Sequence, residues 1–368
     1  MDKLRVAIVG CGGIANVAHI PAIKQCKELE VVAICDINPA KFDKTLAHIG
    51  KNVPTYENYK EMIIKEKPDL VHVCTPNYLH SPISVFALDN GANVLCEKPD
   101  SISVEDVTAM KDAEARSGKK LMVMRNNRFG PAAQYAKAMA ASGKMGDVYT
   151  GRCGWIRRRG IPGRGGWFTT KEQSGGGPLI DLGVHMIDLA MYIMGNPKAV
   201  AVMGATYNKF ANAEYSSDSK HATFGDAVKG GTFDVEDLAI GFIRFENGAS
   251  LQIEFSWASN IFREKTFVEL RGSKAGINYH GPYGLQVFSG DKRSESLGTR
   301  LRKNFVPTGK LTKDYKFDGK QHNAQVKHFV DVILRGATPE YTIDQGINMI
   351  KILTGLYKSA ESGKEVTL

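Results

Sequence analysis

The fold of this 368-residue chain is decided by the stretch Val6-Ala7-Ile8-Val9-Gly10-Cys11-Gly12-Gly13-Ile14-Ala15. A short apolar run passes here into a pattern that fits G-x-G-x-x-G/A, the fingerprint of dinucleotide-binding loops. The first glycine permits a tight turn, and the second lets the backbone approach a pyrophosphate. The helix that follows offers unpaired N–H groups to the phosphates. We therefore expect a dinucleotide to be bound by Gly10, Gly12, Gly13, Ile14 and Ala15.

Asp36 strengthens this interpretation. It ends the second predicted strand 21 residues after Ala15, close to the spacing of about 20 at which a carboxylate accepts from adenosine ribose hydroxyls. A 2′-phosphate would be repelled there, and the next residue, Ile37, offers no cation. The pattern predicts NAD rather than NADP. The alternative is an unrelated α/β turn with a solvated aspartate.

The first third of the chain alternates short β-rich runs with helical stretches. We predict strands at residues 4–9, 31–35, 70–74, 93–96 and 120–124. We predict helices at residues 16–26, 39–49, 56–65, 82–90 and 104–117. Such alternation is typical of an α/β fold with a Rossmann-type, doubly wound parallel sheet.

The pattern changes beyond about Gly146. Two β-rich runs, 238–245 and 250–257, are joined by a turn containing Asn247-Gly248, which is a hairpin signal. This part predicts an α+β domain with a mostly antiparallel sheet. It also contains a strong helix at 179–194, closing helices near 324–334 and 343–361, and a polar loop over 208–229. We place the domains at residues 1–125 and 126–368.

Composition limits the classes of function. The chain is 43% hydrophobic and 24% charged, as in ordinary globular proteins. Its formal net charge of +9 is interspersed with acidic residues and lacks an aromatic-interleaved basic repeat, so we expect no nucleic-acid partner. The apolar run 6–9 is too short for a signal or membrane segment, so we expect a cytoplasmic chain without a leader and without a membrane partner.

The six cysteines contain no C-x-x-C pair. Five of them lie in or beside apolar runs, where cysteine behaves as a small hydrophobe. We therefore expect neither a disulfide framework nor a zinc site, and we find no other metal-ligand spacing.

Two short motifs end neighbouring strands of the predicted parallel sheet. They are Thr75-Pro76-Asn77 and Glu97-Lys98-Pro99. Ligands of open α/β sheets bind at the carboxyl ends of the strands. Proline fixes the backbone after Lys98, so this lysine is a candidate to be held toward a nicotinamide. The alternative is a surface lysine paired with Glu97.

The predicted helix 179–194 follows three glycines and a proline, which permit a sharp entry. Its polar residues Asp181, His185, Asp188 and Tyr192 fall on one stripe beside an apolar one. A carboxylate one turn before a histidine orients the imidazole for general acid/base work. The alternative is that Asp181 only complements the helix N-terminus and His185 is a core histidine.

Together these motifs resemble the Gfo/Idh/MocA family of glucose–fructose oxidoreductases, inositol dehydrogenases and rhizopine-catabolism proteins. The resemblance covers essentially the whole chain. It rests on the glycine loop, Asp36, Thr75-Pro76-Asn77 with His80, Glu97-Lys98-Pro99, Asn127-Arg128-Phe129, the Asp181 and His185 helix, and the tail 359–364. One departure is Ala15 in place of the third glycine, which the general pattern accepts.

The resemblance implies an N-terminal Rossmann domain that binds NAD and a C-terminal domain that binds substrate through an open, largely antiparallel sheet. It implies a homo-oligomer, either a dimer or a tetramer. Further cofactor contacts are expected at Thr75, Pro76, Asn77, His80, Glu97 and Lys98. The implied catalytic set is Lys98, Asp181 and His185, in which His185 takes a hydroxyl proton, Lys98 stabilises the reacting oxygen and Asp181 positions both.

The substrate is expected to contact Lys98, Arg128, Trp155, Arg159, Trp167, Asp181 and His185. The segment 157–168 precedes the catalytic helix. Its arginines are candidates for a carboxylate, phosphate or nucleotide, and Trp155 or Trp167 for stacking on a sugar or aglycone. The alternative for the run 157–159 is a solvated basic loop or a subunit contact.

The leading hypothesis is an NAD-dependent dehydrogenase that oxidises a ring secondary hydroxyl of a neutral sugar, glycoside or inositol. C3 is the narrower expectation. Two alternatives stay open. One is a lyase or glycosidase that oxidises its sugar transiently, and the other is an NAD-binding sensor without turnover. The three filled catalytic positions argue against the sensor.

Overall fold

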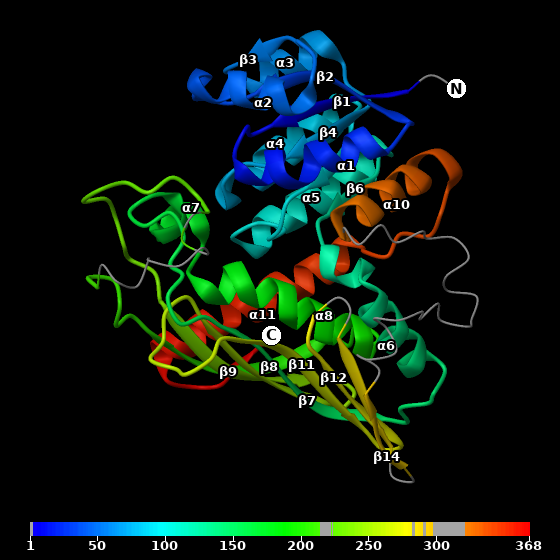
Figure 1. Ribbon diagram of the computed structural model, residues 1–368, viewed down its shortest axis with the longest axis vertical. Coiled ribbons are helices and arrows are strands. Elements are labelled where there is room, and N and C mark those ends of the chain that lie inside the picture. Colours follow the sequence, from blue (N-terminus) through cyan, green and yellow to red (C-terminus); the bar gives the residue numbers. More distant parts are fainter. Residues whose placement is uncertain (1–2, 214–221, 223, 282–283, 290–291, 297–320) are drawn as a thin grey trace. The chain divides into compact units, whose positions relative to one another are not determined.

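The computed structural model describes residues 3–213, 222, 224–281, 284–289, 292–296 and 321–368 (Figure 1). The chain forms two compact units. The first comprises residues 1–126, 173–175 and 320–350, and the second comprises 127–172, 176–319 and 351–368. The predicted boundary at 125/126 lies beside the first break. The continuous second domain that we predicted differs from the structure, because residues 320–350 return to the first unit.

The first unit is built on six parallel strands, and it confirms the predicted fold class. Their order is β3-β2-β1-β4-β5-β6. The strands are β1 (Leu4–Val9), β2 (Leu29–Cys35), β3 (Thr55–Tyr56), β4 (Leu70–Val73), β5 (Asn93–Cys96) and β6 (Leu121–Val123). The order reverses beside β1, so the carboxyl ends of β1 and β4 flank the point where ligands of such sheets bind.

The helices of the first unit follow the predicted alternation. They are a π-helical turn (Ala15–His19) that runs into α1 (Ile20–Gln25), α2 (Phe42–Ile49), α3 (Tyr59–Glu66), α4 (His80–Asp89), α5 (Val104–Ser117) and α10 (Gln321–Arg335). Helix α3 begins later than predicted because the Asn58 side chain caps it, accepting the N–H of Lys60 at 2.9 Å.

Helix α10 joins the first unit through its polar residues. The Gln325 amide accepts the N–H of Arg125 at 2.8 Å and donates to the carbonyl of Val123 at 2.9 Å, so it extends the hydrogen bonding of edge strand β6. Asp100 is fully buried and accepts from both Arg125 and Tyr341. These contacts explain the return of the chain. Helical periodicity alone does not say which sheet a helix covers.

Among its described residues, the second unit contains nine strands in the order β14-β13-β12-β11-β7-β10-β9-β8-β15. They are β7 (Val148–Ile156), β8 (Ala199–Tyr207), β9 (Leu238–Phe245), β10 (Ser250–Ser256), β11 (Lys265–Gly272), β12 (Ala275–Tyr279), β13 (Leu285–Ser289), β14 (Lys292–Ser296) and β15 (Val366–Thr367). Only β7 and β10 pair in parallel among them. The predicted hairpin is confirmed, with Gly248 at φ 83° in the turn between β9 and β10.

Helices cover one face of this sheet. They include α6 (Pro131–Ala141), α8 (Val184–Met194) and the second half of α11 (Ile343–Ser362), and the short α7 (Lys171–Ser174) precedes α8. Figure 1 shows α8 and α11 lying along the same face. The stretch Lys171–Met194 is long and apolar enough to cross a membrane, but its most apolar window is 83% buried, which is typical of a core helix. The described part of the predicted loop 208–229 belongs to no named strand or helix.

Candidate active site

Gly10 and Gly12 of the glycine loop differ in the space beside them. Gly10 has φ 97°, and a Cβ there would lie 2.4 Å from the carbonyl oxygen of Cys74. A Cβ at Gly12 would meet nothing within 4 Å. Gly10 is therefore required by the fold, whereas Gly12 exposes its backbone to open space, as a pyrophosphate contact needs. The Asn16 side chain, which we did not single out from the sequence, fixes the loop by donating to the carbonyls of Cys11 and Gly12.

Asp36 lies against the glycine loop. Its carboxylate accepts the N–H of Cys11 at 2.8 Å and the N–H of Asn38 at 2.8 Å. Each carboxylate oxygen keeps a further lone pair for a ribose hydroxyl. The Lys41 ammonium lies 4.0 Å from the same carboxylate. From the sequence we considered only Ile37, the residue next to Asp36, and so did not identify Lys41, which lies five residues beyond Asp36 along the chain. The loop and Asp36 together fit an adenosine dinucleotide.

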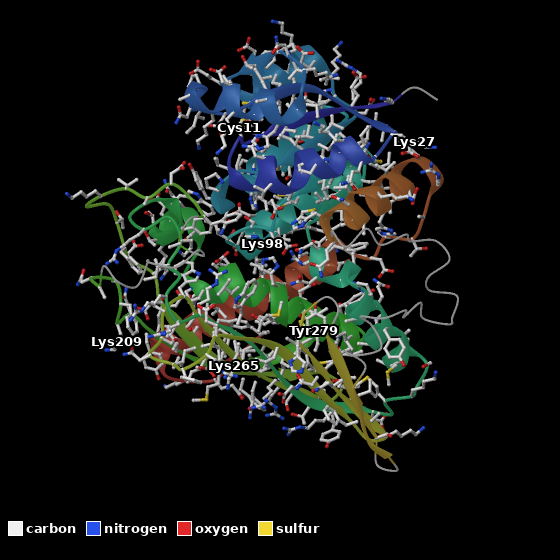
Figure 2. All side chains as sticks on the ribbon, in the orientation of Figure 1. Cys11, Lys27, Lys98, Lys209, Lys265 and Tyr279 are labelled. Atoms are coloured by element: carbon white, nitrogen blue, oxygen red, sulfur yellow. The ribbon has the colours of Figure 1, made fainter. Side chains whose placement is uncertain are left out.

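Lys98 is held in a rigid turn after β5. The Lys98–Pro99 peptide is cis, and the Lys98 N–H donates to the Glu97 carboxylate at 3.1 Å. Figure 2 labels Lys98 and, in the same unit, Cys11 of the glycine loop. Glu97 is buried, and its other oxygen lies 2.9 Å from Nε2 of His19. Glu97 thus fixes the backbone of Lys98 with one carboxylate oxygen and contacts His19 with the other.

A pair of buried histidines supports Glu97. Nδ1 of His19 lies 2.8 Å from Nδ1 of His72, and neither ring is exposed. Burial alone raises the pKa of Glu97, but the hydrogen bond and charge of His19, with the charges of His322 and Lys98, bring it down to about 2. Burial and the charge of His19 hold the pKa of His72 well below its usual value. No sequence motif indicated this pair, because its members lie on separate elements.

The motif after β4 is only partly available for ligand contact. The Thr75 hydroxyl is buried and has no hydrogen-bond partner among the described residues, so it fits a cofactor contact. Asn77 donates to the carbonyl of Ser174 at 2.7 Å. The predicted cofactor contact of the His80 side chain is not favoured by its surroundings. Its ring nitrogens lie 2.7 and 2.9 Å from the carbonyls of Pro99 and Thr75, so it ties two loops together and has no ring nitrogen left for a ligand.

In the second unit, a buried carboxylate holds the start of the helix that carries Asp181 and His185. Glu236 accepts the N–H of Gly177 at 2.9 Å and that of Leu179 at 3.0 Å, and the Tyr357 hydroxyl donates to it at 2.9 Å. A Cβ at Gly176 would lie 2.0 Å from the Tyr357 hydroxyl, and one at Gly177 would lie 2.0 Å from the Glu236 carbonyl. Packing therefore requires glycine at both positions. No motif in the sequence indicated that Glu236 would hold the start of this helix.

Asp181 and His185 both lie half-buried near the start of this helix. Residues Leu179–Gly183 form a π-helical turn, a deviation that is frequent at functional sites. The indole of Trp257 donates to the Asp181 carboxylate at 2.9 Å, and the ring of Trp155 lies 6.0 Å from that of His185. A fixed carboxylate and an imidazole on one helix have the chemistry of an acid/base pair.

The polar stripe of this helix has two different halves. Asp188 is buried and receives two hydrogen bonds from Arg128, at 2.8 and 2.6 Å. The Arg128 guanidinium also lies over the ring of Tyr192, at 5.0 Å. The charge of Arg128 is therefore matched by a buried aspartate, and the predicted contact of Arg128 with substrate stays a prediction. Asp188, in the C-terminal half of the stripe, is thus paired by Arg128, whereas Asp181 and His185 in the N-terminal half are half-buried.

The remaining predicted substrate residues separate into different environments. Trp167 stacks on Phe168, with ring centroids 3.8 Å apart. Arg159 forms an isolated β-bridge with Ala258. Trp155 lies near His185 and under the guanidinium of Arg157. The structure thus groups Trp155, Asp181 and His185 in the second unit, whereas Lys98 belongs with Glu97 and His19 in the first.

The six cysteines are free and buried. Burial and the charge of Asp36 raise the pKa of Cys11 to about 12. The thiol in the glycine loop is therefore neutral at physiological pH and acts as a small packing group.

Comparison with known proteins agrees with this geometry. A model of an oxidoreductase family with an NAD-binding Rossmann fold matches residues 4–125, and a model of the GFO/IDH/MocA C-terminal domain matches residues 133–278. D-glucoside 3-dehydrogenase from Escherichia coli (strain K12) is 32% identical over 369 residues, covering 100% of this chain and 98% of that protein. Levoglucosan dehydrogenase from Pseudarthrobacter phenanthrenivorans is 27% identical over 318 residues, covering 82% of this chain and 80% of that protein.

Solved structures share the fold over the full length. The aldose-aldose oxidoreductase from Caulobacter crescentus, complexed with glycerol, superposes with a TM-score of 0.80 at 24% identity and covers 100% of both chains. The two family models together span more than half of the sequence, and they describe the two parts of the chain in the observed order. The chain therefore belongs to the Gfo/Idh/MocA family of NAD-dependent oxidoreductases.

Proposed function

We propose that this protein is an NAD-dependent sugar dehydrogenase that oxidises a ring secondary hydroxyl of a sugar, glycoside or inositol, with C3 as the reacting carbon. The observation that carries the proposal is the pair on one helix, Asp181 held by Trp257 and His185 beside Trp155. A polarised imidazole with an aromatic neighbour suits proton removal from a sugar hydroxyl. The relatives named as D-glucoside 3-dehydrogenase and levoglucosan dehydrogenase support this substrate class.

Each side chain has a stated role in this proposal. His185 takes the proton of the reacting hydroxyl. Lys98 donates a hydrogen bond to the same oxygen and stabilises the negative charge that develops on it. Asp181 orients the imidazole and the neighbouring hydroxyls. Bound NAD supplies the hydride acceptor. Glu97 holds the backbone of Lys98 in place by accepting its N–H at 3.1 Å.

The experiment is turnover with NAD and a panel of inositols, hexoses and methyl glycosides, followed by the absorbance of NADH. We expect activity on a neutral sugar or glycoside. Lys98→Ala should lower kcat/KM by about 10²–10³-fold, because it removes one donor to the developing oxyanion. Full turnover by Lys98→Ala contradicts the mechanism. Product release without net NADH points instead to a transient oxidation, as in a lyase or glycosidase.

We also propose that the protein is a homo-oligomer. Met203 pairs with Phe242 across β8 and β9. Ile240 lies two residues before Phe242 in β9 and therefore on the same face of the sheet, and all three side chains are exposed. An exposed apolar patch on a sheet face is typical of a subunit interface. Phe242→Asp should convert a dimer or tetramer into smaller species in light scattering.

We further propose a cytoplasmic location. The buried free thiols of the six cysteines support it, because such thiols persist in a reducing compartment, and cell fractionation tests it.

A further inference from the structure

Arg157 is a buried cation without an ion-pair partner among the described residues. It follows β7 and is 8% exposed, whereas its neighbour Arg158 is exposed. Its Nη1 donates to the carbonyl of Gly160 at 3.3 Å. Its Nε is buried and has no hydrogen-bond partner in the described part of the chain. Buried guanidinium groups are normally paired, so the unpartnered Nε and the lack of an ion pair in the described residues point to a ligand acceptor beside Arg157.

Two carboxylates lie near enough to act on Arg157 without pairing with it. Burial lowers the pKa of Arg157, and the charges of Asp181 and Glu264 oppose this shift. Glu264 accepts the N–H of Arg158 at 3.0 Å, and Asp181 accepts from Trp257 at 2.9 Å. The charge of Arg157 is therefore balanced only at a distance, and its donors remain available for a ligand oxygen.

The surroundings of Arg157 include the proposed catalytic pair. Its guanidinium lies 5.0 Å from the ring centre of Trp155, and Trp155 in turn lies 6.0 Å from the ring of His185. All these residues and Asp181 belong to the second unit. The group thus combines a donor-only side chain, an acceptor-only carboxylate and an aromatic ring.

We propose that Arg157 and Asp181 together bind one ring hydroxyl of the sugar, the hydroxyl next to the carbon that is oxidised. This inference rests on the proposed function and names its specificity-determining residue. The hydroxyl accepts from Arg157 and donates to Asp181, and only a group that does both satisfies the two side chains. In this proposal that hydroxyl is vicinal to the one whose proton His185 takes. The substrate class is a neutral sugar or glycoside with a free vicinal diol.

A carboxylate or phosphate on the substrate fits these side chains less well. It would satisfy Arg157, but it has no proton to donate to Asp181 and would be repelled by that carboxylate. The same two residues therefore favour a neutral hydroxyl over an anion. A preference for glucose 6-phosphate or a glucuronide that depends on Arg157 would overturn the proposal.

The test uses the full-length protein with methyl D-glucopyranoside and its 2-deoxy and 4-deoxy analogues, which lack one hydroxyl beside C3. The kcat/KM of the wild type should be about 10- to 100-fold lower for one analogue than for the parent glycoside, the range expected for the loss of a hydrogen bond to a charged group. Arg157→Ala should lose a similar factor on the parent glycoside, mainly through KM, and should no longer discriminate against that analogue. Arg158→Ala is the matched control and should behave as the wild type.

Several results would overturn the inference. One is an Arg157→Ala variant that keeps both its turnover and its discrimination. If that variant does not fold, Arg157→Lys keeps the charge but not the planar donor pair, and it should still reduce discrimination. If the wild type turns over no glycoside, the proposed function fails separately. Quenching of tryptophan fluorescence by methyl D-glucopyranoside then tests binding, and the same quenching in Arg157→Ala, or no quenching in the wild type, contradicts the role of Arg157.

Discussion

Two glycine turns of this molecule lead into five-residue π-helical segments, Ala15–His19 and Leu179–Gly183, but they differ in what lies beside them. At Gly12, a Cβ would meet nothing within 4 Å, whereas at Gly177 it would meet the backbone of Glu236 at 2.0 Å. Both helix starts present N–H groups to an anion. Beside the first turn the space next to these N–H groups is open to a cofactor. Beside the second turn it is occupied by the Glu236 carboxylate. Similar glycine patterns therefore serve a ligand in one unit and packing in the other.

The largest expected effect is on the filled turn. Gly177→Ala should destabilise the protein by more than about 3 kcal/mol or prevent folding, because a backbone carbonyl blocks the new methyl group and cannot rotate away. Urea unfolding followed by circular dichroism measures this loss. Gly12→Ala is the control and should unfold within about 0.5 kcal/mol of the wild type. Equal stabilities for the two variants would remove the distinction between the turns.

Two buried carboxylates sharpen the comparison through pH. Glu97 faces His19, His322 and Lys98, and its pKa is lowered to about 2 from 4.5. Its stabilising contribution is therefore complete above pH 4.5 and is lost as the pH falls toward 2. The stability gap between wild type and Glu97→Gln should be on the order of 3 kcal/mol at pH 7 and close as the pH approaches 2, in urea unfolding at each pH.

Glu236 should show the opposite trend. Burial raises its pKa, although the N–H groups of Gly177 and Leu179 and the Tyr357 hydroxyl oppose the shift. Its contribution to stability is complete below the usual glutamate pKa and is lost as the pH rises through the raised value. The gap between wild type and Glu236→Gln should therefore be larger at pH 4 than at pH 8. A gap that grows with pH would show that Glu236 is matched by a positive charge, as Glu97 is.

A smaller effect is expected on cofactor affinity at the open turn. Gly12→Ala should raise the Kd for NAD by about 10- to 100-fold, since the methyl group occupies the space through which the backbone approaches the pyrophosphate. Calorimetric titration with NAD measures it. Unchanged affinity in Gly12→Ala would mean that the open space at this glycine does not receive the pyrophosphate.

The smallest effect concerns the choice between the two dinucleotides. Asp36→Ala should weaken NAD about tenfold relative to NADP, because the ribose loses its acceptor and the repulsion of a 2′-phosphate disappears. Lys41 lies 4.0 Å from this carboxylate and should assist the phosphate in the variant. Adding Lys41→Ala should therefore reverse part of the gain for NADP. An Asp36→Ala variant with unchanged preference contradicts the role of Asp36.

Much of the first unit was predictable because its signals are local. The strands β1, β4 and β5 are short, mostly apolar and mostly buried runs, and the glycine loop and Asp36 directly follow strand ends. The contacts that were missed join residues far apart in the chain. His19 meets Glu97 across 78 positions, and Tyr357 meets Glu236 across 121. The sequence motifs that contain Arg128 and His80 were recognised, but the groups to which these two side chains bind were not.

The sequence by itself determined the family, the parallel sheet, the cofactor loop and the identity of the candidate acid/base residues, since each depends on spacing within a few turns of chain. Tertiary structure decided which polar residues remain available for chemistry. It paired Arg128 with Asp188 and left Arg157 without an ion pair in the described residues. It also placed protein beside Gly177 and open space beside Gly12. The reason is physical: a polar group is available only when no buried partner satisfies it, and those partners are brought near by folding.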